Sequence, residues 1–150
     1  MKYEKFIEEA GLNSADFRWA FAFCNDGEHI TEPELADELA NLVLSGKKTA
    51  TASALADYAE ANEPLPTVDG KFDILLNGKG EPVAALTNTR VYQTKFNEVT
   101  AEHAFKEGEG NRTLAYWRQV HEEFFRELGL FSPDMAIICE EYKVLYKKEH

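Results

Sequence analysis

Cysteine is scarce in this sequence: the 150 residues contain two, Cys24 and Cys139, which lie far apart and form no CxxC pair. A disulfide framework or a thiolate zinc site needs several cysteines at short spacings. His29, His103 and His150 show no metal-ligand spacing among themselves either. We therefore expect no disulfide, no metal and no cofactor, and we expect both thiols to be reduced in the cytoplasm.

Long apolar runs are also absent. No segment approaches the roughly 18 consecutive apolar residues that a membrane-spanning helix needs. The first ten residues, MKYEKFIEEA, mix charged and apolar side chains too evenly for a signal peptide. We therefore expect no membrane partner.

Positive charge is in short supply. The chain has 16 Lys and Arg against 27 Asp and Glu, a net charge of -11, and residues 1–45 contain three basic and ten acidic side chains. A protein that binds nucleic acid mainly by neutralising phosphates usually has a basic excess. The composition thus excludes broad nucleic-acid binding, and any contact with RNA or DNA is expected to use a local site.

What the chain does contain is enough for one folded domain. Its length fits a single domain with a proper core. With 44% hydrophobic and 12% aromatic residues, it has the composition of a globular protein. We find no repeat or convincing boundary, so we expect residues 1–150 to form one domain.

Periodicity and turn residues predict an α+β order of elements. Helices are expected at 2–10, 15–23 and 33–45, around 99–106 and from about 113 to 128. Strands are expected at 49–53, 72–76, 83–92 and 135–146, with an irregular connection at 57–69. The Asn77-Gly78 turn is expected to supply the positive φ angles of a hairpin.

The first candidate site is the helix-to-strand junction SGKKTATAS at 45–53. Lys47 and Lys48 follow a helix C-terminus, where the helix dipole favours cations. Thr49 and Thr51 alternate on the strand, which places both hydroxyls on one side. The alternative is a capped helix with solvated lysines and a polar strand face.

The second candidate is the loop EGEGNRT at 107–113. Gly108 and Gly110 allow the backbone to approach a ligand closely, and the N–H groups that begin the next helix attract anions. Glu107 and Glu109 would repel an anion, however. The alternative is a loop that only caps the helix, with Thr113 as the capping residue.

His121 lies four residues from Trp117 and from Phe125, at the border of an apolar helical stripe. This spacing favours a packing histidine over a catalytic one. No GxSxG, HExxH or GxGxxG motif occurs. Single residues therefore indicate no function, and the two segments must be considered together.

Together the segments resemble a known family. GKKTAT at 46–51, the hairpin at 73–83 with its NGKGEP turn, and EGEGNRTLAYWRQVH at 107–121 resemble the ASCH domain, more closely its stand-alone bacterial branch. The likeness runs from about Trp19 to Tyr146. Asn111 and Thr113 stand where aspartate and serine are expected; Thr113 keeps the hydroxyl, whereas Asn111 lacks the charge.

The resemblance implies a PUA-like fold: a small mixed β-barrel with helices inserted between strands, a cleft between the two segments, and an N-terminal helical extension at 1–30. ASCH domains were proposed as RNA-binding modules. Some bacterial members are described as amidohydrolases that deacetylate N4-acetylcytidine, and others as ribonucleases. By motif position, the amidohydrolase trio falls on Lys48, Thr51 and Glu107.

The trio allows two assignments. A neutral Lys48 would take a proton from Thr51 or a water, and Glu107 would protonate the leaving amine. Alternatively, Lys48 stays charged and pairs with Glu107. The ligand-binding candidates around the trio are Lys47, Thr49, Gly108, Glu109, Gly110, Arg112, Thr113 and Arg118.

Two hypotheses follow. The first is a site for a nucleoside or nucleotide with hydrolase activity on a modified pyrimidine. The second is a non-catalytic PUA-like RNA-binding module, or a ribonuclease. The acidic composition favours the small ligand, and the sequence does not indicate an oligomeric state.

Overall fold

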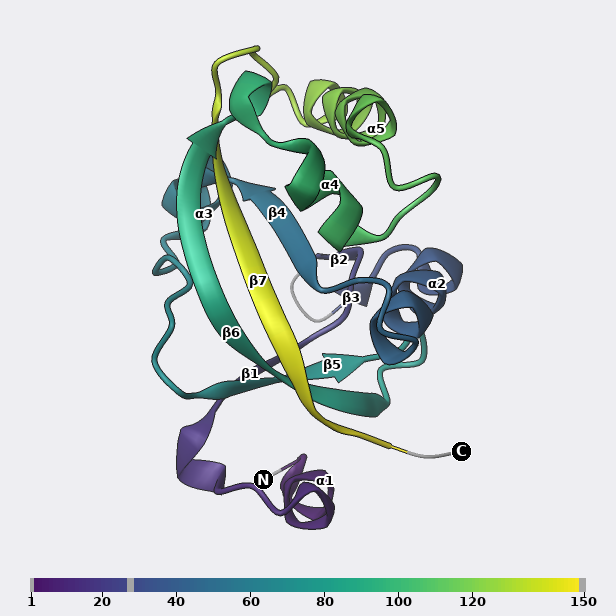
Figure 1. Ribbon diagram of the computed structural model, residues 1–150. Coiled ribbons are helices and arrows are strands. Elements are labelled where there is room, and N and C mark those ends of the chain that lie inside the picture. Colours follow the sequence, from purple (N-terminus) through teal and green to yellow (C-terminus); the bar gives the residue numbers. More distant parts are fainter. Residues whose placement is uncertain (1, 27–28, 149–150) are drawn as a thin grey trace.

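A computed structural model describes residues 2–26 and 29–148 (Figure 1). Five strands form one sheet in the order β1-β5-β6-β7-β4, and β2 pairs with β3 in a small second sheet. The strands are β1 Phe17–Phe21, β2 Asn25–Asp26, β3 His29–Ile30, β4 Ala50–Ala54, β5 Phe72–Leu76, β6 Pro82–Lys95 and β7 Ala136–Lys147. The helices are α1 Glu4–Ala10, η1 Ser14–Asp16, α2 Pro33–Leu44, α3 Leu55–Ala61, η2 Phe96–Glu98, α4 Ala101–Glu107 and α5 Leu114–Glu127.

The longest strands, β6 and β7, form an antiparallel pair in the interior of the sheet. It runs from Ala84 opposite Lys147 to Lys95 opposite Ala136, with register shifts at 85/86 and 88/90. Bulges strengthen the twist of a strand pair, and both strands curve along their length (Figure 1). Among the described residues, no pairing between the edge strands β1 and β4 closes the sheet. The α+β class is therefore confirmed, whereas closure into a barrel stays a prediction.

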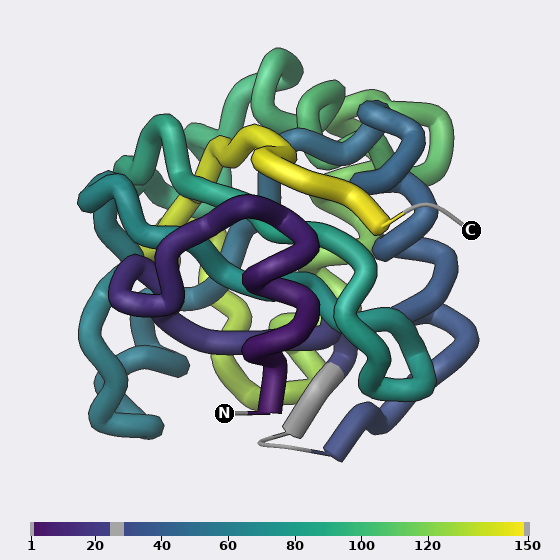
Figure 2. The backbone as a smooth tube through the Cα atoms, turned by 90° about the horizontal axis from the view of Figure 1, so that it is seen from below, coloured from purple at the N-terminus to yellow at the C-terminus, as the bar shows by residue number. Residues whose placement is uncertain are grey.

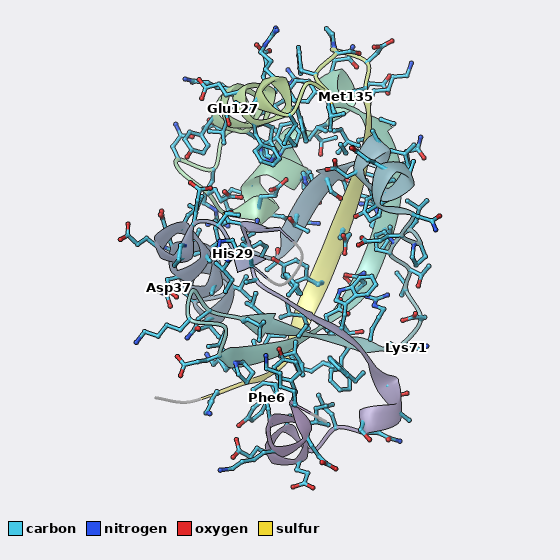
Figure 3. The ribbon with its side chains drawn as sticks, turned by 180° about the vertical axis from the view of Figure 1, so that it is seen from behind. Phe6, His29, Asp37, Lys71, Glu127 and Met135 are labelled. Carbon is cyan, nitrogen blue, oxygen red and sulfur yellow. The ribbon has the colours of Figure 1, made fainter. Side chains whose placement is uncertain are left out.

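Helices cover the sheet at both ends. α4 and α5 lie together at one end and α1 lies at the other (Figure 1); viewed from below, α1 lies in front of the sheet (Figure 2). The labelled side chains Glu127 and Met135 mark the α5 end, and Phe6 marks the α1 end (Figure 3). Three buried clusters result: one under α4 and α5, one between α2 and the sheet, and one between α1 and the sheet.

Most predicted elements are confirmed within a few residues. α1, α2, α4 and α5 correspond to the helices expected at 2–10, 33–45, 99–106 and 113–128. β4, β5, β6 and β7 correspond to the four expected strands. The Thr113 side chain caps α5 by accepting a hydrogen bond from Tyr116 N.

The helix predicted at 15–23 is wrong, because residues 17–21 form β1, parallel to β5. Phe17, Ala20 and Phe21 fit a helical spacing, yet the segment FRWAF is short and rich in aromatic residues that favour strands. A bidentate ion pair from Arg18 Nε and Nη2 to Asp73 on β5, at 2.9 and 3.0 Å, fixes the strand in place. Within the described part of residues 1–30, the only α-helix is Glu4–Ala10. The division into a domain with an N-terminal extension stays a prediction.

Two smaller predictions also fail. Residues 57–69 are not wholly irregular, since the good helix formers before the prolines make α3, which ends at Asn62 with φ +54°. In the hairpin turn, the positive φ of +79° belongs to Gly80, whereas Gly78 is not among the positive-φ residues. Glycine is required at position 78 because the hairpin turn approaches the start of α2 closely: a Cβ there would lie 2.2 Å from the Pro33 carbonyl oxygen.

This contact predicts the effect of Gly78→Ala. The added methyl group would force the hairpin away from the start of α2, and we expect a loss of about 1–3 kcal/mol of stability. Thermal unfolding should show a melting temperature lower by several degrees, whereas Lys79→Ala, at an exposed neighbour, should change it little. Equal melting temperatures for the two variants would contradict the close approach.

Candidate functional site

The site is built where the end of α4 meets the start of β4. Thr100 caps α4 by accepting a hydrogen bond from His103 N, and Gly108 ends the helix with φ +73°. A Cβ on Gly108 would lie 2.4 Å from the Lys47 carbonyl oxygen. Thr49 N donates to the Lys106 carbonyl at 2.7 Å. The two segments singled out in the sequence are therefore held against each other by backbone contacts.

Lys48 is the centre of this junction, and only 2% of its surface is exposed. Its Nζ donates to Ala50 O at 2.9 Å and to Glu109 Oε2 at 3.0 Å, and it lies 3.4 Å from Glu107 O. The Glu107 carboxylate oxygen Oε1 is 3.6 Å from the same nitrogen. An ammonium group has three donors and no acceptor. This set of oxygen acceptors favours the charged form of Lys48, the second of the two assignments.

Glu107 is equally buried and its carboxylate is held from several sides. His103 Nε2 donates to Oε2 at 2.6 Å, and Trp117 Nε1 donates to the same oxygen in a short hydrogen bond. His121 Nε2 lies 3.7 Å from Oε1. Burial by itself would raise the pKa of this carboxyl, but the hydrogen bond from His103 and the charges of Lys48 and the two histidines hold it well below its ordinary value. Glu107 is thus an anion that orients its neighbours.

His103 completes the cluster. Its Nδ1 faces the Tyr92 hydroxyl at 3.5 Å, while Nε2 faces Glu107. Burial lowers the pKa of His103, but hydrogen bonds with Cys139 and Glu107 and the charge of Glu107 raise it to about 9. At neutral pH the buried cations Lys48 and His103 therefore balance Glu107 and Glu109.

A small cavity adjoins this cluster. It has a volume of about 10 Å³ and is lined by Glu107, Glu109 and His121, together with residues of α5. This is roughly the space that one water occupies. His121 stacks on Trp117 with ring centroids 4.1 Å apart, and its Nδ1 lies 2.8 Å from the Trp117 carbonyl. His121 is therefore both a packing residue and a lining residue of the site.

Thr51 does not contact Lys48 or Glu107 through any hydrogen bond of the described residues. It pairs with Glu140 across β4 and β7. Ala52 and Ala54 pack under α4 and α5, so the pleat turns Thr51 to the opposite face. The predicted alternation holds for Thr51 and Ser53 against Ala52 and Ala54, whereas the Thr49 hydroxyl lies 3.4 Å from Lys106 O on α4. Lys48 and Glu107 meet at the junction. Thr51 lies beside Glu140 on the sheet face that is turned away from α4 and α5, which is called the inner face below.

The inner face of the sheet has a second polar cluster. Asn88 Nδ2 donates to Glu140 Oε2 at 3.2 Å and lies 3.3 Å from Thr67 O. The hydroxyls of Ser53 and Tyr58 are 2.6 Å apart. Burial raises the pKa of Glu140, and its hydrogen bond with Asn88 only partly opposes this effect. Polar side chains from β4, α3, β6 and β7 thus share the face on which Thr51 lies.

Several ligand-binding candidates from the loop have structural contacts instead. Arg112, at φ +63°, donates to Phe105 O and Lys47 O and stacks on the Phe105 ring at 3.6 Å. The Gly108 N–H donates to Phe105 O and is therefore not free for an oxyanion. Arg118 donates to Asn97 O and lies 3.5 Å from Val99 O. Among described residues, Arg118 has no hydrogen bond to the Lys48 cluster.

The remaining ligand-binding candidates lie around the Lys48 junction. Lys47 and Thr49 are exposed, and the Thr49 hydroxyl is 3.4 Å from Lys106 O. A Cβ on Gly110 would collide with the Tyr116 ring. Glu109 keeps a side chain that is 25% exposed while it binds Lys48. It is therefore the solvent-accessible partner of that lysine.

The unusual Asn111 keeps the local geometry without a carboxylate. Its Oδ1 accepts hydrogen bonds from Thr113 N at 3.1 Å and from Thr113 Oγ1 at 2.6 Å. An amide oxygen satisfies the same donors as a carboxylate oxygen. The charge at 111 is thus dispensable for forming this loop.

Sequence reasoning did not assign His103, Tyr142, Asn88 or Glu140 to the site. His103 and Glu107 are four residues apart, which places them on the same face of a helix. This spacing could have indicated that His103 contacts Glu107. Glu140 interrupts an apolar strand pattern, which is a sign of a buried polar role. Tyr142 and Asn88 are brought to the face by register, which the sequence does not display.

In residues 2–26 and 29–148, no group of three or more His, Cys, Asp and Glu side chains is arranged to hold a metal ion. No helix in that part of the chain is long and apolar enough to cross a membrane.

Glu107→Gln tests the buried charge balance. Removal of the negative charge leaves Lys48 and His103 without their shared partner, and such a loss costs about 3–5 kcal/mol. Urea denaturation should show this decrease. Glu102→Gln on the same helix, where the side chain is 76% exposed, serves as the control. Similar stabilities of the two variants would contradict the role of Glu107.

The raised pKa of His103 predicts a pH dependence. Its folded-state pKa of about 9 exceeds the ordinary value of 6.5, so the stabilisation is fully present below pH 6.5 and is lost as pH rises through 9. The free energy of unfolding should therefore fall across this window, and His103→Gln should flatten the slope. An unchanged slope in the variant would show that His103 does not hold the extra proton.

Comparison with known proteins agrees with this architecture. The family model of the ASCH domain matches residues 20–146. The ASCH domain from Lactobacillus crispatus JV V101 is 30% identical with a TM-score of 0.80, and the match covers 97% of this chain and 94% of that one. Protein EF3133 from Enterococcus faecalis V583 is 35% identical with a TM-score of 0.75, covering 95% and 84%.

A third structure, the hypothetical protein PH0355, is 15% identical with a TM-score of 0.52, covers 85% of this chain and 97% of that one, and shares the fold alone. The search of curated proteins finds no match. The family model spans most of the sequence and both segments of the site. The chain therefore belongs to the ASCH domain family, with its PUA-like fold.

Proposed function

We propose that this ASCH domain binds a nucleoside or a short RNA-derived ligand at the Lys48 site and hydrolyses an acyl amide of the N4-acetylcytidine type. The observation that carries the proposal is the buried Lys48 ammonium between Glu107 and Glu109, next to the polar inner face. Burial of so many charged groups costs folding free energy unless they are paired. Active sites are where such arrangements gather.

In this proposal the two carboxylates have different roles, which their burial and contacts support. Glu107 is buried, accepts hydrogen bonds from His103 and Trp117, and has a lowered pKa. It therefore holds Lys48 in place and is a poor proton donor. Glu109 is the more exposed partner of Lys48, and a ligand oxygen that displaces it gains a charged donor from Nζ.

The proposed hydrolysis uses these roles. The Thr51 hydroxyl, or a water, attacks the acyl carbon while the Lys48 ammonium hydrogen-bonds to the carbonyl oxygen as negative charge develops there. The bond between the acyl carbon and the exocyclic nitrogen breaks. The displaced Glu109 carboxylate carries the proton from the nucleophile to the leaving amine. If Thr51 is the nucleophile, a water releases its acyl group in a second step.

The alternative is an RNA-binding module without catalysis, or a ribonuclease. Arginine and aromatic rings meet at the surface, where Arg18 lies 4.9 Å from the Trp19 ring, which is 39% exposed. Such pairs suit base stacking. The net charge of -11 opposes long RNA, because a strand would cross a repulsive surface.

Incubation of the pure protein with N4-acetylcytidine tests the hydrolase. We expect release of acetate and cytidine, and a loss of about 10²–10⁴-fold in kcat for Lys48→Ala and Thr51→Val. Thr51→Val keeps the side-chain shape, and Lys79→Ala serves as a remote control. Circular dichroism checks the folding of each variant.

Intact substrate with the wild-type protein would refute the enzymatic proposal. Binding of short RNA across salt concentrations then decides between the remaining functions. Salt-dependent binding without cleavage supports the module, and cleaved RNA supports the ribonuclease.

A further inference from the structure

His121 on α5 has one ring nitrogen bound to the backbone and the other directed at the site. Its ring stacks on Trp117 with centroids 4.1 Å apart and an angle of 15° between the planes. Nδ1 lies 2.8 Å from the Trp117 carbonyl oxygen, which can only accept a hydrogen bond. Nδ1 therefore carries a proton in the neutral ring as well as in the charged ring. The nitrogen that gains and loses a proton is Nε2.

Nε2 faces a carboxylate oxygen that lacks a hydrogen bond. The hydrogen bonds from His103 and Trp117 to the Glu107 carboxylate both reach Oε2. In residues 2–26 and 29–148, no hydrogen bond reaches Oε1, which lies 3.7 Å from His121 Nε2 and 3.6 Å from Lys48 Nζ. Oε1 and the Nε2 of a neutral ring are both acceptors. A small donor between them would satisfy both.

The small cavity under α5 has room for such a donor. Glu107, Glu109 and His121 line it, and its volume of about 10 Å³ suits one water molecule. A water that donates one hydrogen to Nε2 and the other to Oε1 directs its lone pairs away from both. The lining also includes Thr113 and Tyr116, which are exposed. It thus extends from the buried carboxylate to the molecular surface, where a ligand can approach the water.

Thr51 lies on the other side of the sheet from this cavity. It pairs with Glu140 across β4 and β7, whereas the next residue, Ala52, packs under α4 and α5. Successive side chains of a strand point to opposite faces. Of the two nucleophiles in the proposed hydrolysis, water is therefore the one that the groups around Glu107 can activate.

The surroundings of His121 stabilise a proton on Nε2. The charged groups of the cavity and the junction beside it are Glu107 from α4, Glu109 from the loop before α5, and Lys48 from the segment before β4. The neighbours on α5 are the aromatic rings of Trp117 and Phe125. Lys48 is already bound to Glu109 at 3.0 Å. Glu107 Oε1 is thus free to stabilise an imidazolium, as the aspartate of a Ser-His-Asp triad does.

We propose that His121 is the general base of the hydrolysis, and that Nε2 and Glu107 Oε1 together hold and activate the attacking water. The inference rests on the proposed function and refines it: water is the nucleophile, and His121 carries the proton in place of Glu109. The water oxygen bonds to the acyl carbon while one proton passes to Nε2. The bond between the acyl carbon and the exocyclic nitrogen breaks, and Nε2 gives its proton to that nitrogen. The second proton of the water leaves with the acid that forms.

His121→Gln tests the assignment, with His29→Gln at an exposed position as the matched control. With N4-acetylcytidine as substrate, kcat should fall about 10²–10⁴-fold in His121→Gln and stay unchanged in the control. A base acts only when it is unprotonated, so the wild-type kcat should fall at acidic pH. This acidic limb should be missing in His121→Gln and retained in Glu109→Gln. Lost ring packing alone would not remove a limb of the pH profile.

Nitrogen NMR of the wild-type protein tests the geometry without any variant. As the pH is raised, Nε2 of His121 should lose its proton while Nδ1 keeps its own. A neutral ring with the proton on Nε2 would overturn the inference, because Nε2 could not then accept a proton from water.

The kinetic outcomes separate this inference from the proposed function. If the wild type hydrolyses the substrate and His121→Gln keeps the acidic limb, at any rate, the inference fails and the proposed function stands. The same holds if the limb disappears in Glu109→Gln instead. If the wild type leaves the substrate intact, both fail.

Discussion

The ion pair between Lys48 and Glu107 is the interaction on which the site depends. Both side chains are 2% exposed, and neither is stable there without the other. To bring them together, α4 must end against the first residues of β4, a contact that Gly108 permits because a Cβ would collide with the Lys47 carbonyl. The requirement for this pair thus explains the glycine, the short helix and the buried histidine behind it.

The same pair separates two environments. On one side, Trp117 and His121 stack and close the cluster under α5. On the same side, Glu109 lines the small cavity with His121 and keeps a side chain that is 25% exposed. On the other side, the inner face presents Thr51 and Glu140. Under the proposed function, a ligand would approach Lys48 and replace Glu109, its more exposed partner. The acidity of the chain has a local role here, because the carboxylates of Glu107 and Glu109 orient the N–H donors of Lys48, His103 and Trp117.

Features of local structure could be predicted from the sequence where the type of a single residue determines them. Thr113 caps α5 as a capping residue should, and the alternation at 50–54 places Thr51 and Ser53 on one face. The β1 segment was not predictable, since its spacing suits a helix and its aromatic content suits a strand; the distant Asp73 decides by binding Arg18. The positions that depend on strand register, such as Tyr142, become visible only in three dimensions.

Nuclear magnetic resonance titration with cytidine, the nucleoside product of the proposed hydrolysis, tests the central claim of a ligand site at Lys48 most directly. Observation of the Lys48 ammonium and the neighbouring amides reports on the site itself. We predict shifts for the Lys48 Nζ group and for the amides of Thr51, Glu109 and Tyr142, with little change at the remote α1. Shifts that spare this group of residues while another surface responds would contradict the account.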